Sequence, residues 1–128
     1  MDTLVIGFSG ALGALARYIL SQWAKDWNHT PYPLGTFMIN ITGSFFIGLI
    51  MTLAIEKFVI SPKWRLAITS GFLGGFTTFS TFAYETIQLI NNGRFGLAML
   101  YAIASIAFGL IGAWVGISLA RLVEKRED

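Results

Sequence analysis

The residues of this chain that could bind an ion are concentrated in the stretch Gly71 to Phe82. This stretch holds hydroxyl and aromatic side chains close together, namely Thr77, Thr78, Phe79, Ser80, Thr81 and Phe82. Hydroxyl groups can donate hydrogen bonds to an anion or accept them from water. The edge of an aromatic ring is electropositive, and it can face an anion without a formal cation nearby. The pattern therefore indicates a wall that faces a small anion.

The same stretch is a weak point for a helix, because it also contains the pair Gly74-Gly75. Glycine and β-branched residues lower helix stability. A helix that unwinds at Gly74 to Thr77 would free backbone carbonyls, and freed carbonyls buried in protein can hold a cation such as Na⁺. The alternative is that the small residues only allow close helix packing, while the phenylalanines fill gaps that face lipid.

The elements that carry this stretch are membrane helices. The runs Trp27–Ile55, Leu66–Tyr84 and Phe95–Ala120 contain no Asp, Glu, Lys or Arg. Each run reaches or exceeds the roughly 18–20 residues that cross a bilayer. Charged residues make up only 12% of the chain, compared with about 25% in soluble proteins. The composition is that of an integral membrane protein.

We therefore predict an all-α membrane protein with four transmembrane helices in a single transmembrane domain, residues 1–128. The helices are expected at about 4–23, 34–58, 62–91 and 95–123, with both termini on one side of the membrane. The third helix, which contains Gly71 to Phe82, is predicted to be broken near its midpoint.

Two polar side chains inside these helices have more than one interpretation. Asn40 is costly in hydrocarbon without partners, so it is either an interhelical hydrogen-bonding group or a donor that faces a pore. Arg17 either extends toward the lipid headgroups or lines an aqueous vestibule that collects anions. The sequence leaves both pairs of alternatives open.

Small residues mark the faces on which these helices should pack closely. In the first helix they are Gly7, Gly10 and Gly13, and in the fourth they are Ser105, Gly109, Gly112 and Gly116.

Several other functions lack their sequence signals. The chain has no cysteine, which excludes disulfides and cysteine-based metal sites. No nucleophile–base pair or metal cluster that would indicate an enzyme is visible. The net charge is only +2, and the basic residues lie near helix ends, where they anchor membrane helices. A nucleic-acid partner is therefore not expected.

The run Gly71 to Phe82, followed by Glu85, resembles the signature of the CrcB/Fluc fluoride channel family. The runs from Gly13 to Arg17 and from Gly35 to Asn40 are similar to other motifs of that family. The resemblance extends over the whole chain. It implies an antiparallel, dual-topology homodimer with two fluoride pores. It also implies a central Na⁺ at the dimer interface, held by the backbone carbonyls of Gly74 and Thr77 from both subunits.

The resemblance also implies roles for individual side chains. Phe79, Phe82 and Asn40 match pore residues of the family, and Ser80 and Thr81 fall in the polar track beside the phenylalanines. Tyr101 and Ser105 resemble the pore hydroxyls of the fourth helix. Gly109 stands where some members carry a further serine, which leaves the end of this track undefined. Arg17 and Glu85 would lie at the vestibules.

The function implied is passive export of fluoride across the inner (plasma) membrane of a prokaryote, which lowers toxic fluoride in the cytoplasm. Fluoride is small and strongly hydrated, so a pore must replace its water with donors and still release it. Hydroxyls, an amide and ring edges meet both demands. The expected partners are fluoride, membrane lipid and a second copy of this chain.

Two other transport or assembly functions compete with this prediction. A proton-coupled exporter of the small multidrug resistance type needs a carboxylate embedded in the first helix, where this chain has Arg17 and no acid after Asp2. A non-transporting scaffold would use the glycine faces alone and would leave the phenylalanine and hydroxyl pattern unexplained.

The third alternative is one subunit of a heterodimeric fluoride channel with a fixed orientation. On the side of the termini lie Lys57, Lys63, Arg65, Arg121, Lys125 and Arg126, and toward the other side lie Arg17, Lys25 and Arg94. The excess of basic residues on the side of the termini favours termini in the cytoplasm. Dual topology, in contrast, requires only a weak difference in basic residues between the two sides.

Overall fold

The computed structural model describes residues 1–126, and its regular elements in that range are all helical. They are α1 (Asp2–Trp27), α2 (Leu34–Ile55), α3 (Pro62–Leu66), the π-helix η1 (Ala67–Leu73), α4 (Gly74–Phe76), α5 (Phe79–Asn91) and α6 (Phe95–Ala120). The predicted range 4–23 is shorter than α1 at both ends, and the predicted ranges 34–58 and 95–123 extend beyond the ends of α2 and α6.

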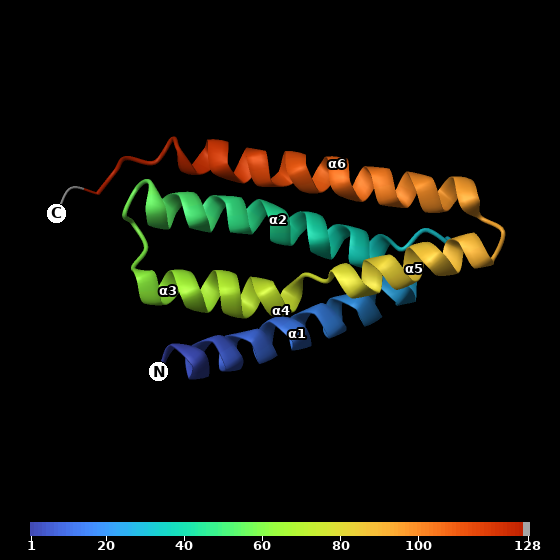
Figure 1. The fold of residues 1–128 in the computed structure, drawn as a ribbon, viewed down its shortest axis with the longest axis horizontal. Helices are drawn as coiled ribbons and strands as arrows, with labels where there is room; N and C mark the ends of the chain where they lie inside the picture. The colour runs from blue at the N-terminus through green and yellow to red at the C-terminus, as the bar shows by residue number, and fades with distance from the viewer. Residues whose placement is uncertain (127–128) are drawn as a thin grey trace.

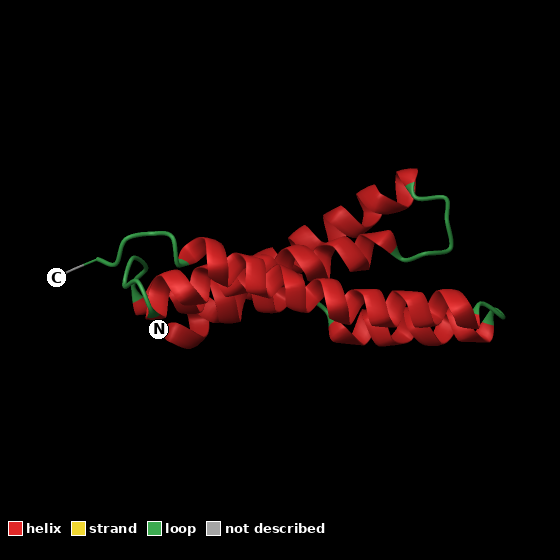
Figure 2. Cartoon of the chain, turned by 90° about the horizontal axis from the view of Figure 1, so that it is seen from above, coloured by secondary structure: helices red, strands yellow, loops and turns green. Residues whose placement is uncertain are grey.

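The elements make up four segments, namely α1, α2, α3 to α5, and α6. These segments lie side by side in a bundle (Figure 1). The third segment consists of a leading half, α3–η1–α4, and a trailing half, α5. The start of α1 and the end of α6 lie at the same end of the bundle (Figure 1). At the opposite end the helices separate into two arms, each closed by a loop, as Figure 2 shows.

The three uninterrupted helices, α1, α2 and α6, are each long and apolar enough to cross a membrane. Their outer surfaces carry large apolar side chains with high exposure, such as Phe8 at 70%, Ile103 at 66% and Trp114 at 67%. A single chain in water does not present so much apolar surface without a partner. These faces are suited to lipid or to another membrane subunit.

The two halves of the third segment pack against different helices. The leading half lies mainly along α1, whereas α5 packs mainly on α6, and α6 also packs along α2. The interruption between α4 and α5 therefore allows one segment to change its partner midway through the bundle.

Close backbone contacts hold the leading half against α1. A Cβ on Gly13 would overlap the carbonyl of Phe72, and one on Gly75 would overlap the carbonyl of Gly10. Only glycine permits this approach. Gly7 has no atom within 4 Å of its virtual Cβ, so the close-packed face of α1 is shorter than the glycine spacing predicts.

Close contacts between glycines and backbone carbonyls also join α2 to α6. A Cβ on Gly48 would overlap the carbonyl of Ala113, and one on Gly116 would overlap the carbonyl of Phe45. A Cβ on Gly112 would lie 3.2 Å from the carbonyl of Ile41. The predicted small-residue face of the fourth helix therefore packs on α2.

Polar contacts tie the residues after α6 to the loop between α2 and α3. Arg121 Nε and Glu56 Oε2 are 3.0 Å apart, and the Lys125 Nζ lies 4.9 Å from the ring centroid of Phe58. The amide of Arg126 donates to the carbonyl of Lys57 at 2.9 Å. The hydrogen bonds from Arg121 hold the pKa of Glu56 below its ordinary value.

We predict that Gly13→Ala destabilises the protein by about 1–3 kcal/mol, the usual cost of overpacking, because the new Cβ forces α1 away from the leading half. Thermal unfolding in detergent measures the effect. Gly7→Ala is the matched control, and it should be neutral or stabilising, since alanine has the higher helix propensity. Equal losses in both variants would show that the contact at Gly13 has no special role.

Candidate functional site

The third segment is broken at Thr77 and Thr78. Both residues have extended backbone conformations, with ψ angles of 156° and 122°. The predicted break is present, but it lies later than the predicted unwinding at Gly74 to Thr77, because Gly74–Phe76 remain helical. The Thr77 amide still donates to the carbonyl of Leu73 at 3.0 Å, and Gly75 is used for close packing on α1 rather than for unwinding.

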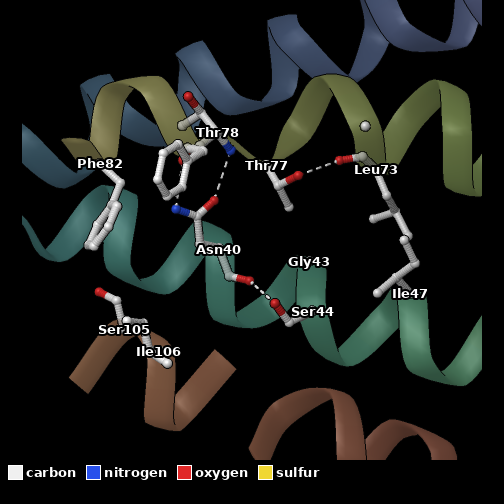
Figure 3. A pocket seen from close by; sticks show the side chains of 12 residues that line it. Asn40, Gly43, Ser44, Ile47, Leu73, Thr77, Thr78, Phe82, Ser105 and Ile106 are labelled. Carbon is white, nitrogen blue, oxygen red and sulfur yellow. Dashed lines mark hydrogen bonds between the residues drawn. The ribbon is translucent and has the colours of Figure 1, made fainter. Parts of the chain in front are cut away.

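Asn40 replaces hydrogen bonds that the break removes (Figure 3). Its Nδ2 donates to the carbonyl of Thr78 at 2.9 Å, and its Oδ1 accepts from the amide of Thr78 at 2.8 Å. An amide nitrogen carries two hydrogens, so one hydrogen of Asn40 remains for a further partner. Asn40 therefore bonds to another segment and also borders the cavity described below.

Thr78 organises the start of α5. As the N-cap residue, its Oγ1 accepts from the amide of Thr81 at 3.2 Å. The Thr81 hydroxyl lies 3.2 Å and the Ser80 hydroxyl 3.3 Å from the same oxygen. The structural importance of Thr78 was not predicted, although a threonine before a helix start is a known N-cap signal. Ser80 and Thr81 do not line the cavity.

The break also changes the partners of the carbonyls that precede it. In a continuous helix the Thr78 amide would bond to Gly74, and the Thr81 amide would bond to Thr77. The Thr78 amide is bound to Asn40 instead, and the Thr81 amide to the Thr78 side chain. The carbonyls of Gly74 and Thr77 therefore lose their helical donors.

A cavity of about 340 Å³ lies beside the break, between α2, the third segment and α6 (Figure 3). Its lining consists of Asn40, Gly43, Ser44, Ile47, Leu73, Gly74, Thr77, Thr78, Phe79, Phe82, Ser105 and Ile106. Among residues 1–126, the Ser105 Oγ is a buried polar atom without a hydrogen-bond partner. The Ser105 hydroxyl is therefore available to a partner that enters the cavity. Gly43, Ile47 and Ile106 were not predicted, because apolar lining residues give no local signal.

Aromatic rings lead away from the cavity. The ring of Phe82 lies 5.8 Å from that of Phe79 and 5.0 Å from that of Tyr101, measured between centroids. Phe79 is 79% exposed, whereas Tyr101 is fully buried and outside the cavity lining. The Tyr101 hydroxyl donates to Glu85 Oε1 at 3.4 Å. Phe79, Phe82 and Tyr101 therefore form a row of neighbouring rings that extends from the cavity toward Glu85.

Glu85 lines a second, more polar hollow of about 380 Å³ at the end of the bundle opposite the termini. Lys25 and Arg94 also line this hollow, but Arg17 does not. The Nε of Arg17 instead donates to the carbonyl of Gly75 at 3.1 Å, beside the break. Neither sequence interpretation of Arg17 included this contact.

The structure gathers some of the predicted site residues and separates others. Around the cavity it brings together Asn40, Gly74, Thr77, Phe79, Phe82 and Ser105. Outside the cavity it places Arg17, Ser80, Thr81, Glu85 and Tyr101. Gly109 lies on α6 with its virtual Cβ 3.7 Å from Ser44 Oγ.

The cavity combines an amide, hydroxyls and ring edges, which are groups that can surround a small anion. No group of three or more His, Cys, Asp or Glu side chains that could hold a metal occurs within residues 1–126. The side-chain oxygen atoms around the cavity belong to hydroxyl groups and to the Asn40 amide, and backbone carbonyls lie beside them.

Comparison with known proteins identifies the family. Residues 4–117 match the family model described as CrcB-like protein, Camphor Resistance (CrcB). Over 116 residues the chain is 47% identical to the fluoride-specific ion channel FluC of Acidobacterium capsulatum, covering 91% of this chain and 93% of that protein. It is 45% identical to the FluC of Geotalea daltonii over 124 residues, covering 96% and 100% of the two chains. With these matches along nearly its whole length, the chain belongs to the CrcB family of membrane proteins.

Proposed function

We propose that this chain is a subunit of a fluoride-selective ion channel that lets fluoride leave the cytoplasm passively and so lowers its toxicity. The observation that carries the proposal is the cavity at the break, which contains the unpartnered Ser105 hydroxyl and the free amide hydrogen of Asn40. Membership of a family with relatives named fluoride-specific ion channels supports it.

The lining groups suit fluoride on physical grounds. A selective pore must replace the hydration shell of the ion and yet bind it weakly enough for release. Neutral donors such as the Ser105 hydroxyl and the Asn40 amide, together with the edge of the Phe82 ring, can do this. A lysine or arginine in the cavity would hold fluoride more tightly, and none is among the lining residues.

We also propose a Na⁺ ion at the carbonyls of Gly74 and Thr77. These oxygen atoms fit a hard cation, because the break has removed their helical donors. Bound Na⁺ would supply positive charge that compensates two exposed carbonyl dipoles in an apolar bundle. The side chains of Asn40 and Thr78 hold the backbone that presents these carbonyls.

The proposed assembly is an antiparallel, dual-topology homodimer in the inner membrane of a prokaryote. Two carbonyls are too few to replace the hydration shell of a cation, so a second copy that supplies the same pair would complete the site. The high exposure of Phe79, at 79%, supports a surface that awaits a partner. The organisms of the relatives are bacteria.

The first prediction from the proposed function concerns the selectivity for fluoride over chloride. Liposomes that contain the purified protein should release fluoride down its gradient at a rate far above that of protein-free liposomes, and should retain chloride. A fluoride electrode and a chloride electrode measure the two fluxes. Equal fluxes of both anions, or no fluoride flux, would refute the proposed function.

The second prediction concerns the cavity wall. Phe82→Ile should lower fluoride flux by about tenfold or more, which corresponds to a barrier increase of ~1.4 kcal/mol, because the aliphatic side chain has no electropositive ring edge. The protein should still elute as the natural assembly. Phe95→Ile is the matched control, since Phe95 lies at the start of α6 outside the cavity. Natural flux in Phe82→Ile would exclude Phe82 from the ion path.

The third prediction concerns orientation. Tags placed at both termini should be accessible to an impermeant label from both sides of the membrane, because a dual-topology homodimer inserts in both orientations. Spheroplasts and inverted vesicles measure the two accessible fractions. Labelling from one side alone would favour the heterodimeric alternative, in which this chain has a fixed orientation.

A further inference from the structure

Arg17 brings a permanent positive charge to the break in the third segment. Its Nε donates to the carbonyl of Gly75 at 3.1 Å, across a sequence separation of 58 residues. The hydrogen bond joins α1 to a carbonyl two residues before the extended residue Thr77.

The close packing of α1 brings this side chain within reach. A Cβ on Gly13, one turn before Arg17, would overlap the Phe72 carbonyl, and one on Gly75 would overlap the Gly10 carbonyl. Side chains on a helix lean toward its N-terminus, so Arg17 extends back toward the level of these contacts. The packing of α1 against the third segment therefore accounts both for the close glycine contacts and for the hydrogen bond from Arg17 to Gly75.

The break removes the helical donors of four successive carbonyls, those of Gly74 to Thr77, and the Gly75 carbonyl is the second of them. Glycine has more backbone freedom than any other residue. Without a fixed partner, the peptide group after Gly75 could rotate and offer a third oxygen to a cation. Because Arg17 donates a hydrogen bond to that oxygen, the oxygen is not available to a cation.

We infer that Arg17 is a positioning residue for the Na⁺ site of the proposed function, on which this inference rests. By holding the Gly75 carbonyl, it fixes the orientation of the Gly74-Gly75 backbone. The carbonyls of Gly74 and Thr77 are then the ones presented to the cation. Arg17 itself does not touch the ion.

Thermal unfolding of the full chain in detergent tests this role without any flux measurement. Na⁺ is titrated at constant ionic strength, with choline as the replacement cation. A ligand that binds only the folded state raises the Tm once its concentration exceeds the dissociation constant, and the rise then continues logarithmically. The Na⁺ concentration at which the rise begins, its onset, therefore reports the Na⁺ affinity. Loss of a group that orients metal ligands typically weakens metal affinity by about 10–100-fold.

In Arg17→Met the rise should therefore begin at a Na⁺ concentration about tenfold or more above that of the natural chain, because methionine has no hydrogen-bond donor for the Gly75 carbonyl. Arg65→Met removes one positive charge far from the break, at α3, and it should keep the natural onset. A lower Tm with an unchanged onset in Arg17→Met would mean that Arg17 serves stability alone, and it would overturn the inference.

If Arg17→Met is too unstable to titrate, Arg17→Lys takes its place. Lysine has no donor at the position of Nε, so the onset of its rise should shift in the same direction, and a natural onset would overturn the inference. A natural chain whose Tm does not respond to Na⁺ would overturn both the Na⁺ site and the role of Arg17. Fluoride flux from the same preparation would then test the channel function separately.

Discussion

Backbone hydrogen bonding is the constraint on which the rest of this structure depends. Within a membrane, a broken helix leaves amides and carbonyls that water cannot satisfy, and each unsatisfied group costs several kcal/mol. The break at Thr77 and Thr78 is tolerated because other groups replace the missing bonds. Asn40 satisfies both backbone groups of Thr78, and the Thr78 side chain caps α5.

The same replacements leave a defined set of polar groups behind. The carbonyls of Gly74, Gly75 and Thr77 all lose their helical donors, and Arg17 donates to that of Gly75. Some polar groups therefore stabilise the break by hydrogen bonding, whereas others remain available to bind ions. A site of this kind needs few specialised side chains, since the backbone provides much of its chemistry.

The break also decides where the aromatic side chains lie. The leading half packs along α1, whereas α5 packs on α6. This change of partner places Phe82 beside Tyr101 on α6 and beside the cavity that holds Ser105.

The sequence by itself determined that the chain is helical and apolar, that its third segment is interrupted near the middle, and that Gly71 to Phe82 resembles a family motif. These features are local, because hydropathy, glycine content and motif spacing are all read from neighbouring residues. Only the tertiary structure decided that Gly75 packs on α1 while the break falls at Thr77 and Thr78. It likewise paired Arg17 with Gly75 and left Ser105 unpartnered, since hydrogen bonds between residues distant in sequence depend on how the helices pack.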